Sequence, residues 1–363
     1  MRTVFVGAQE KPNGINSYTY NLALELTNRG YDSLVISWGA CNKQTDYRGT
    51  KIIQYKTYGG TMASIPLLYW KSLFYLIRHR REVDVVMFQT VKFAVLPSFI
   101  LRLFGIKTYS CIHSLAEDSP KHGILTKALL VVSMYISLLL SRNVITVSHT
   151  KAQQVYSRYH KKCKVLPCGV YLPSAENIKS NVLENNGIRA GKYFLTIGRI
   201  DPIKNYEVLI SAFKQHDYKD YQLVIGGDVN NDYGRKIVSL AQGCDNIIFP
   251  GLIYGDDKDV LLRHCLAYCL VSSSEGLPIA LLEGMSYSKL LIVTKIPAIQ
   301  EVLEKYQIGL WCDVNDVSDV TKNMKLVENS YENIRAEENV ALKIVKENYT
   351  WQHICDLYLN MFK

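Results

Sequence analysis

The sequence predicts an α/β protein built from two doubly wound, Rossmann-like domains. Short apolar runs rich in β-branched residues alternate with helical patterns, as expected for a parallel sheet covered by helices on both faces. The alternation is interrupted by a polar, helix-poor segment, residues 173–191, and then restarts. The chain has 363 residues, 48% of them hydrophobic, which is enough for two such cores. We therefore expect a ligand-binding cleft between two domains.

The individual elements follow from these patterns. In the first half, the runs that predict buried strands are residues 3–6, 33–36, 83–88, 107–112 and 143–147, and the clearest helical patterns are 17–29, 96–104 and 124–141. After the restart, the predicted strands are 193–197, 222–225, 246–249, 267–271 and 290–293. The resulting boundaries are an N-terminal domain at 1–170, an interdomain linker at 171–190, a C-terminal domain at 191–345 and a C-terminal helix at 346–363.

The two halves of the chain carry opposite net charge. Residues 1–170 contain 22 Lys and Arg against 8 Asp and Glu, a balance of +14, whereas residues 171–363 contain 20 against 25, a balance of −5. A strongly basic half predicts an anionic partner: nucleic acid, a phosphorylated substrate or the anionic surface of a membrane. The sequence has no recognisable nucleic-acid-binding motif, so we do not expect nucleic acid to be the partner.

Two segments of the basic half have the composition of membrane-associated helices. Residues 66–81 run from apolar and aromatic residues into a basic cluster, which fits an interfacial helix and equally a core-facing helix with a charged end. Residues 128–140 carry no charge, but they are shorter than the roughly 20 residues needed to span a bilayer. A buried or monotopic helix is therefore expected there.

Cysteine usage and the amino terminus indicate a cytosolic protein. The nine cysteines form no CxxC pair and no zinc-type spacing, which favours reduced, mostly buried thiols. Residues 1–9 have the pattern of a buried strand rather than that of a signal peptide.

The stretch FLTIGRIDPIKN, residues 194–205, combines the features of an anion site. A buried strand ends at Gly198, where glycine permits a tight turn, Arg199 offers a planar set of donors for phosphate oxygens, and Lys204 adds a point charge. The carboxyl end of a strand faces the crevice where open α/β sheets bind ligands. Because Arg and Lys are also ordinary surface residues after a strand, this motif does not decide the function alone.

The stretch SSSEGLPIALLEGMS, residues 272–286, places Glu275 and Glu283 on either side of uncharged residues. One interpretation is a helix that begins near Pro278, with Glu275 near its positive end and Glu283 on its solvent face. The other is ligand binding: Gly276 permits close backbone approach, the helix amides favour a diphosphate, and the carboxylates accept hydrogen bonds from hydroxyls. Along one helix the two carboxylates would lie up to about 12 Å apart, which suits a nucleotide sugar.

In combination, GRIDPIK and EGLPIALLE closely resemble the signature of the family-four retaining glycosyltransferases of the GT-B fold: Gly-Arg, then Lys, then two Glu separated by seven residues. Further stretches similar to family motifs are PNGIN (12–16), IHS (112–114), VSHTKAQQV (147–155), LPCGV (166–170) and LVIGGD (223–228). YTWQHICDLYLNMF (349–362) is similar to the terminal helix that crosses back to pack on the first domain. The resemblance covers nearly the whole chain. It implies an acceptor-side domain and a nucleotide-sugar-binding domain that face a central cleft.

The resemblance also implies the roles of single residues. Arg199 and Lys204 would bind the donor diphosphate and offset charge on the leaving group. Glu275 would hold hydroxyls of the transferred sugar, and Glu283 would hold the ribose. The remaining donor-binding positions are Gly14, which would bring backbone amides close to the diphosphate or the acceptor, and Gly198, Gly276 and Leu277.

Two histidines receive different predictions. His113 follows a predicted strand and, by the resemblance, would lie beside the reacting sugar as a fourth catalytic residue; the alternative is a histidine satisfied at a strand end. His149 is expected to be structural.

The implied reaction is transfer with retention of configuration. The acceptor hydroxyl attacks the anomeric carbon on the face that the nucleotide leaves, and a leaving-group phosphate oxygen takes its proton. The resemblance implies neither a metal nor a cofactor, because Arg199, Lys204 and the helix end supply positive charge. The chain departs from the family pattern at Asn13 and Gly14, where many relatives have two glycines, and in residues 295–301, which lack a paired glycine. Both departures concern the acceptor side.

Two other functions stay open: a non-catalytic GT-B module that binds a nucleotide sugar or recruits a partner to the membrane, and a nucleotide-sugar epimerase. The former would be expected to lose Arg199, Lys204 or Glu275, which are all present. The basic, apolar first half suggests a glycan or lipid-linked saccharide acceptor, such as a polyprenyl-diphosphate oligosaccharide or a lipid A core. The expected setting is bacterial lipopolysaccharide O-antigen, capsule or exopolysaccharide biosynthesis, with the protein peripheral on the cytoplasmic face of the inner membrane.

Overall fold

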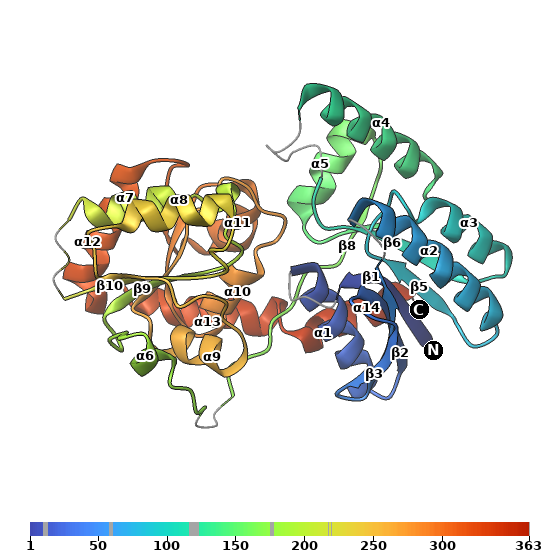
Figure 1. Ribbon diagram of the computed structural model, residues 1–363, viewed down its shortest axis with the longest axis horizontal. Coiled ribbons are helices and arrows are strands. Elements are labelled where there is room, and N and C mark those ends of the chain that lie inside the picture. Colours follow the sequence, from blue (N-terminus) through green and yellow to red (C-terminus); the bar gives the residue numbers. More distant parts are fainter. Residues whose placement is uncertain are drawn as a thin grey trace. The chain divides into compact units, whose positions relative to one another are not determined.

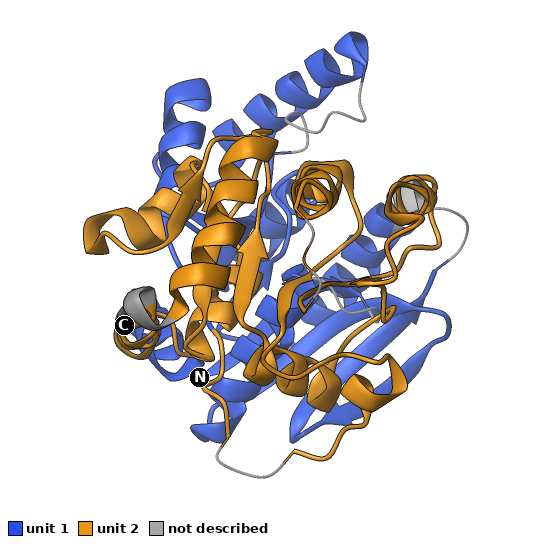
Figure 2. Cartoon of the chain, turned by 90° about the vertical axis from the view of Figure 1, so that its left-hand side faces the viewer, with its two compact units in different colours: residues 1–169, 351–363 blue, residues 170–350 orange. Residues whose placement is uncertain are grey.

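The computed structural model describes residues 1–9, 14–57, 61–115, 123–174, 178–216, 218 and 220–362. The chain forms two compact units: a first unit of Met1–Gly169 together with Trp351–Lys363, and a second unit of Val170–Thr350 (Figure 2). The chain therefore leaves the first unit once and returns to it at its carboxyl end.

The first unit is built on an eight-stranded sheet with the order β3-β4-β2-β1-β5-β6-β7-β8. Neighbouring strands are parallel except β3 and β4, which form an antiparallel hairpin at one edge. The five strands predicted in this half are present, with somewhat different ends. The strands are β1 (Arg2–Gln9), β2 (Asp32–Gly39), β3 (Lys43–Tyr47), β4 (Thr50–Lys56), β5 (Val85–Phe88), β6 (Lys107–Ile112), β7 (Val144–Thr146) and β8 (Lys164–Val165).

Helices cover both faces of this sheet (Figure 1). They are α1 (Gly14–Asn28), α2 (Thr61–Arg78), α3 (Val95–Leu103), α4 (Ile124–Leu140), α5 (His149–Tyr159) and α14 (Trp351–Phe362). Because side chains alternate along a strand, Val4 and Val6 of β1 point to one face, where they share a core with Leu68 of α2. Phe5 points to the other face and contacts Tyr358 of α14. The returning helix is thus part of the first core.

Specific contacts hold α14 in the first unit. Arg29, just after α1, forms an ion pair with Asp356 of α14. Gly169 is required where the helix begins, because a Cβ there would lie 2.8 Å from the ring of Trp351. The glycine of LPCGV therefore has a packing role.

The start of the returning segment differs from the predicted residue 346. Residues 346–348 are the end of α13 (Ala336–Asn348), which belongs to the second unit. The Val170 amide donates to the Tyr349 carbonyl over 2.8 Å, so main-chain pairing at the start of the second unit holds this stretch. The chain first leaves the first unit after Gly169, one residue before the predicted end of the first domain at residue 170.

The second unit contains a six-stranded parallel sheet with the order β11-β10-β9-β12-β13-β14. Its strands are β9 (Tyr193–Ile197), β10 (Gln222–Gly226), β11 (Ile247–Ile248), β12 (Ala267–Leu270), β13 (Leu290–Thr294) and β14 (Leu310–Cys312). Its helices are α6 (Val182–Asn185), α7 (Tyr206–Lys214), α8 (Asp232–Ala241), α9 (Gly255–His264), α10 (Ile279–Ser286), α11 (Pro297–Leu303), α12 (Val317–Ile334) and α13. On one face, Phe194 of β9 shares a core with Leu209 of α7 and Val320 of α12. On the other face, the Tyr193 hydroxyl donates to the Leu261 carbonyl of α9 at 2.6 Å.

The sequence patterns do not predict the hairpin of β3 and β4 or the short strands β8 and β14. The turn between β3 and β4 places Arg48 and Gly49 at positive φ, and the Gly49 amide donates to Asp46 Oδ1 at 2.6 Å. The exposed strand of this hairpin is polar, and β14 has three residues, so neither gives a periodic apolar signal. Both elements lie at sheet edges.

The two segments with a membrane-like composition form helices that face both core and solvent. In α2, Leu73 is buried, as a core-facing helix requires, whereas Trp70 and Phe74 are 44% and 69% exposed. In α4, the buried residues are Met134, Ser137 and Leu138, so most of this helix is not buried. Within the described part of the chain, no helix is long and apolar enough to cross a membrane. All nine cysteines are free, and most of them are buried, as predicted.

Candidate functional site

Two loops of the second unit follow neighbouring strands at the centre of its sheet. From β9 the chain first adds strands on one side, β10 and β11, and then returns to the other side of β9 with β12. The strand order therefore reverses between β9 and β12, and such a switch point leaves a ligand-binding crevice at the carboxyl ends of the strands. GRIDPIK follows β9 and SSSEGLP follows β12, so both motifs lie at the carboxyl ends of these two neighbouring strands.

Close packing shapes the start of the first loop. Gly198, which we expected to permit a tight turn, is not among the glycines with positive φ. A Cβ on Gly198 would instead lie 3.1 Å from the hydroxyl oxygen of Tyr206. A Cβ on Gly227, directly after β10, would lie 2.4 Å from the Gly198 carbonyl oxygen. Gly227 is therefore needed for space, whereas a Cβ on Gly198 would require only a small shift of the Tyr206 hydroxyl.

The next part of the loop is a single 3₁₀ turn, Pro202–Lys204. Asp201 caps it with a side-chain oxygen that accepts a hydrogen bond from a main-chain amide of the turn at 3.3 Å. Asn205 ends the turn in the left-handed region with φ 53°, and its side-chain amide donates to the Val271 carbonyl at 3.1 Å. Because Val271 directly follows β12, this bond fixes the turn against the second loop.

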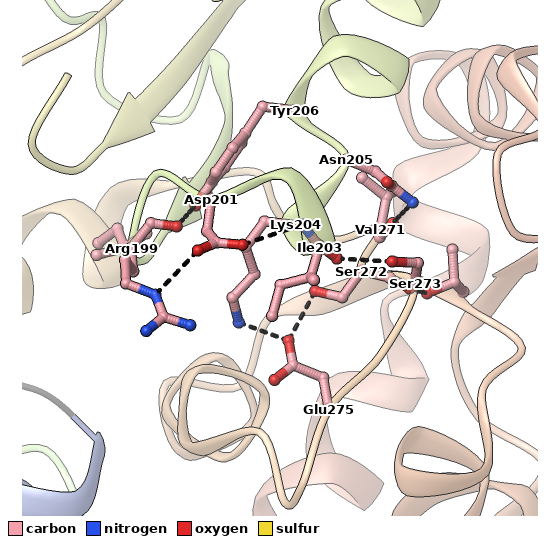
Figure 3. Close-up of polar contacts among 12 residues, drawn as sticks. Arg199, Asp201, Ile203, Lys204, Asn205, Tyr206, Val271, Ser272, Ser273 and Glu275 are labelled. Carbon is pink, nitrogen blue, oxygen red and sulfur yellow. Dashed lines mark hydrogen bonds and ion pairs between the residues drawn. The ribbon is translucent and has the colours of Figure 1, made fainter. Parts of the chain in front are cut away.

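Three of the predicted catalytic residues, Arg199, Lys204 and Glu275, lie together in this region (Figure 3). Lys204 Nζ donates to Glu275 Oε1 at 2.5 Å, and Ser272 Oγ donates to the same oxygen at 2.7 Å. The side chains of Lys204 and Glu275 are 16% and 11% exposed, so water shields this ion pair little. Arg199 Nε lies 3.7 Å from Asp201 Oδ2, and the Arg199 side chain is 73% exposed.

This arrangement offers donors for an anion and an acceptor for hydroxyls. The exposed Arg199 guanidinium has several N–H donors suited to phosphate oxygens, and the Lys204 ammonium has three donors, one of which binds Glu275. Glu275 accepts both of its hydrogen bonds on Oε1. Among the residues that the structure describes, Oε2 has no side-chain donor and so can accept from a ligand hydroxyl.

Glu283 occupies a separate place on α10. Its Oε1 accepts from Lys258 Nζ of α9 at 2.7 Å. Burial alone would lower the pKa of Lys258, but the Glu283 carboxylate outweighs it and the pKa is raised. Glu275 precedes α10, which begins after Pro278, so the two carboxylates do not share one helix and the helical spacing predicted for them is wrong. Of the other predicted donor-binding residues, Gly276 and Leu277 lie in the same loop, and Leu277 is buried.

Two predicted residues lie in the first unit. Gly14 is the first residue of α1; the preceding Pro12 and Asn13 of the PNGIN motif lie outside the described residues. His113 directly follows β6, and its Nε2 lies 2.7 Å from Gln89 Oε1. Burial lowers the pKa of His113 from 6.5 to about 4, so the ring is neutral at physiological pH.

The remaining histidine of the motifs, His149, is the first residue of α5. Ser148 caps this helix by accepting a hydrogen bond from the Lys151 amide at 3.1 Å. The Ser-His pair of VSHTKAQQV therefore starts a helix, which agrees with a structural role.

Three residues that form hydrogen bonds or ion pairs with predicted site residues were not predicted from the sequence. Asp201 supports Arg199 and the 3₁₀ turn, Lys258 pairs with Glu283, and Gln89 binds His113. Asp201 stands inside the GRIDPIK motif and Gln89 directly follows a predicted strand, so both had a sequence signal. Lys258 had none, because its partner lies on another helix.

Family models match both halves of the chain. Residues 12–172 match the model described as Glycosyltransferase Family 4, and residues 179–342 match the model described as Glycosyl transferases group 1. The first match covers residues 12–169 of the first unit and continues to residue 172. The second match lies within the second unit.

Proteins from several bacteria are similar to this chain. The O-antigen chain mannosyltransferase C of Escherichia coli is 22% identical over 218 residues, 59% of this chain and 58% of that protein. The N-acetylgalactosamine-N,N'-diacetylbacillosaminyl-diphospho-undecaprenol 4-alpha-N-acetylgalactosaminyltransferase of Campylobacter jejuni is 23% identical over 238 residues, 63% of this chain and 64% of that protein. The chain thus matches less than two thirds of the length of either relative.

Solved structures share the whole fold. The structure of Anabaena Alr3699/HepE in complex with UDP and glucose has a TM-score of 0.79 to this chain at 16% identity, over 99% of both chains. At this identity the likeness establishes the fold.

Proposed function

We propose that this chain, which belongs to the family-four glycosyltransferases of the GT-B fold, transfers a sugar from a nucleoside-diphosphate sugar to a glycan or lipid-linked saccharide with retention of configuration. The observation that carries the proposal is the ion pair of Lys204 and Glu275 beside Arg199 at the switch point of the second sheet. It joins phosphate-binding cations and a hydroxyl-binding carboxylate in one place. The UDP and glucose in the complex of the structural neighbour support a donor of this class.

Each group then has a defined role. Arg199 and Lys204 contact the diphosphate and stabilise the charge that develops on the leaving group. To do so, the Lys204 ammonium shares its donors between Glu275 and a phosphate oxygen. Glu275 accepts from hydroxyls of the transferred sugar, and Glu283 accepts from the ribose.

The chemical step needs no protein nucleophile. The acceptor oxygen forms a bond to the anomeric carbon on the face that the nucleotide leaves, the bond to the diphosphate oxygen breaks, and a phosphate oxygen takes the acceptor's proton. Glu275 Oε1 is held by both Lys204 and Ser272, which suits a positioning carboxylate rather than an attacking one. Arg199, Lys204 and the amides at the start of α10 supply the positive charge, so we propose a reaction without a metal or cofactor.

A donor screen tests this function. Purified full chain is incubated with UDP-, GDP-, ADP- and dTDP-sugars, and release of nucleoside diphosphate is followed for the wild type, Lys204→Ala, Glu275→Ala and the control Lys236→Ala, an exposed lysine of the same unit. We expect slow release from one donor, its loss in the first two variants and its retention in the control. Binding of nucleotide sugar without release would indicate a non-catalytic module, and an altered free or nucleotide-linked sugar would indicate an epimerase.

We further propose that the acceptor is presented at a membrane, because α4 carries an exposed apolar stripe. Leu125, Leu129, Val132, Ile136 and Leu139 are between 51% and 77% exposed. They are spaced by three or four residues, so they line one face of the helix. A contiguous apolar surface of this kind marks an interaction site rather than an ordinary protein exterior.

The charge of α4 and of two other helices of the first unit, α2 and α3, favours an anionic bilayer as the partner. α2, α3 and α4 contain no Asp or Glu, whereas they contain Lys71, Arg78, Arg102 and Lys127. Apolar side chains that enter the acyl boundary next to cations that bind lipid headgroups are the features of an interfacial helix. We therefore propose a peripheral protein of the cytoplasmic membrane surface in surface-polysaccharide assembly, a setting that the names of the O-antigen and diphospho-undecaprenol relatives support.

Vesicle co-sedimentation tests the membrane surface. The wild type should bind vesicles of phosphatidylglycerol and phosphatidylethanolamine and lose this binding in the variant Leu129→Asp with Ile136→Asp. The matched control, Val238→Asp with Leu240→Asp, changes two exposed apolar residues of the second unit and should bind as the wild type does. Equal binding by the stripe variant and the wild type, or no binding by the wild type, would reject the α4 surface.

A further inference from the structure

Gln89 lies at the switch point of the first sheet. The strand β1 has β2 on one side and β5 on the other, so the strand order reverses between β1 and β5. Gln89 directly follows β5, and its main-chain N–H donates a hydrogen bond to the Val6 carbonyl of β1 at 2.9 Å. It therefore occupies in the first sheet the position that the SSSEGLP loop, which follows β12, occupies in the second, at the edge where ligands of open α/β sheets bind.

A bulge in β1 makes room for Gln89. The register with β2 shifts between Val6 and Ala8, and the intervening Gly7 has φ +114°. A Cβ on Gly7 would lie 3.2 Å from the Gln89 Cβ and 2.8 Å from the hydroxyl oxygen of Tyr69. Glycine is thus needed for both its backbone conformation and the space that it leaves to Gln89.

Folding stability does not explain a glutamine at this place. Gln89 is 6% exposed, and its Nε2 is buried with no hydrogen-bond partner in the described part of the chain. An unsatisfied buried amide costs free energy that an apolar side chain of similar size does not. Among the described residues, the hydrogen bond that the Gln89 side chain does make is the one with His113.

This contact defines the state of the His113 ring. Gln89 Oε1 accepts hydrogen bonds and cannot donate them, so His113 Nε2 carries the proton and Nδ1 of the neutral ring carries a lone pair. Tyr18 packs edge-on against the ring, with centroids 5.1 Å apart, and limits its rotation. His113 is partly exposed, and Nδ1 makes no hydrogen bond within the described residues.

We propose that Gln89 is a positioning residue that holds His113 with Nε2 protonated, so that Nδ1 accepts a hydrogen bond from a substrate hydroxyl. The proposal rests on the proposed transferase function for the identity of the hydroxyl-bearing substrate, a saccharide. Gln89 does not touch the substrate; it acts through His113, and the chain retains it at a cost in stability.

The state of His113 can be measured without any substrate. Protein labelled with ¹⁵N-histidine is studied by long-range ¹H–¹⁵N correlation, and the His113 signals are assigned by their loss in His113→Gln. We expect Nε2 to be the protonated and Nδ1 the unprotonated nitrogen at neutral pH. Protonation on Nδ1 would mean that the Gln89 amide group donates to the ring, and it would overturn the proposal even if the enzyme is active.

Variants of Gln89 separate positioning from packing. Gln89→Leu should lower the kcat of donor turnover at least tenfold while the melting temperature stays within about 4 °C of the wild type, because the substitution also removes the unsatisfied amide. The control Gln54→Leu changes another buried glutamine of the same unit, whose Nε2 donates to the Cys41 carbonyl at 3.0 Å. It should lower the melting temperature more than Gln89→Leu and leave kcat unchanged in the folded protein. Unchanged kcat in Gln89→Leu, or a loss explained by a lower melting temperature, would refute the role.

A carboxylate gives a second, independent measurement. Gln89→Glu keeps an acceptor for the Nε2 proton but places a negative charge beside the ring, which raises the pKa of His113. The acidic limb of the pH–rate profile should therefore move to higher pH, because protonated Nδ1 no longer accepts a hydrogen bond. An acidic limb at the wild-type position would contradict the proposal. If the wild type turns over no donor at all, the proposed function fails, and the ¹⁵N measurement still decides the state of His113.

Discussion

Neutralising either Lys204 or Glu275 should destabilise the second unit, because each substitution breaks their ion pair. The two substitutions should differ in their effect on nucleotide binding: loss of the lysine should weaken it, and loss of the carboxylate should not. The variants that test this are Lys204→Met, which keeps most of the length of the side chain without its charge, Glu275→Gln, which keeps its shape, and the combination of both. Each single variant leaves one partner facing a neutral group, whereas the double variant leaves no unpaired charge.

The size of the effect follows from burial. Removing one partner of a fully buried ion pair costs about 3–5 kcal/mol, whereas an exposed pair contributes about 0–1 kcal/mol. The two side chains are 16% and 11% exposed and the charged atoms are 2.5 Å apart, so the pair lies nearer the buried limit. We expect each single variant to lower the free energy of unfolding of the second unit by about 2–3 kcal/mol. The double variant should lose less than the sum, with a coupling of about 1–3 kcal/mol.

Denaturation has to be followed in the second unit alone. Of the four tryptophans, Trp311 is the one in the second unit, so ¹⁹F NMR of fluorotryptophan-labelled protein in increasing urea reports on that unit through its Trp311 signal. The control cycle uses the exposed pair of Lys343 and Glu347, whose coupling should not exceed about 0.5 kcal/mol. Strictly additive effects at Lys204 and Glu275 would show that the ion pair does not contribute to stability.

Nucleoside diphosphate binding by calorimetry provides the second half of the test. Lys204→Met should weaken binding at least tenfold, about 1.4 kcal/mol, because a phosphate contact is lost. Glu275→Gln should bind nucleoside diphosphate at least as tightly as the wild type, because Lys204 no longer has a competing partner, yet it should lose donor turnover. If Glu275→Gln weakens nucleoside diphosphate binding as much as Lys204→Met does, the separation of phosphate-binding and sugar-binding roles is refuted.

Three further predictions concern other parts of the structure. Glu283→Gln should weaken binding of a nucleoside diphosphate about tenfold but leave inorganic diphosphate binding unchanged, since only the former has a ribose; equal effects on both ligands would contradict a ribose contact. Burial lowers the pKa of His113 from 6.5 to about 4, so the unfolded chain binds more protons in that window and folding stability falls as the pH drops through it. The stability difference between the wild type and His113→Gln should therefore change by up to about 3 kcal/mol between pH 7 and pH 4 in urea titrations, and a constant difference would disprove this. Gly284→Ala should destabilise the second unit by about 1–3 kcal/mol, because its Cβ would lie 2.9 Å from the Tyr268 ring, and unaltered unfolding in urea would show that the ring gives way.

Much of the fold follows from the sequence because its central strands are buried on both faces. Such strands are nearly continuous apolar runs, and β1, β9 and β12 were all predictable from them. The edge elements are different in kind: β3 is largely exposed and carries polar residues, so its pairing with β4 depends on the turn at Gly49 rather than on a hydrophobic pattern. The boundary at α14 was predicted too early because residues 346–348 continue the helical pattern of α13 without interruption.

The candidate site was predictable to the extent that its residues stand next to strand ends. Arg199, Lys204 and Glu275 follow β9 and β12, and parallel strands bring their carboxyl ends to one edge, so proximity follows from topology. The pairing of Glu283 with Lys258 joins two helices whose relative rotation depends on packing, which the sequence pattern does not determine. The buried, unsatisfied amide of Gln89 could be found only in three dimensions.

The charges of the two units imply different kinds of attraction for the proposed anionic donor and the proposed anionic membrane. The second unit is the acidic half of the chain, so its net charge does not attract a nucleoside diphosphate. Each cation of its site has a carboxylate partner: Arg199 has Asp201, Lys204 has Glu275 and Lys258 has Glu283. Such pairing avoids an isolated charge among poorly exposed side chains, and the proposed donor would bind by sharing these cations at short range rather than by long-range attraction. The surface of α2, α3 and α4 has cations without acidic residues on the same helices, and its proposed attraction to an anionic bilayer would be long-range. Salt screens the second kind of interaction much more than the first, so raising the ionic strength should release the protein from vesicles before it weakens donor binding.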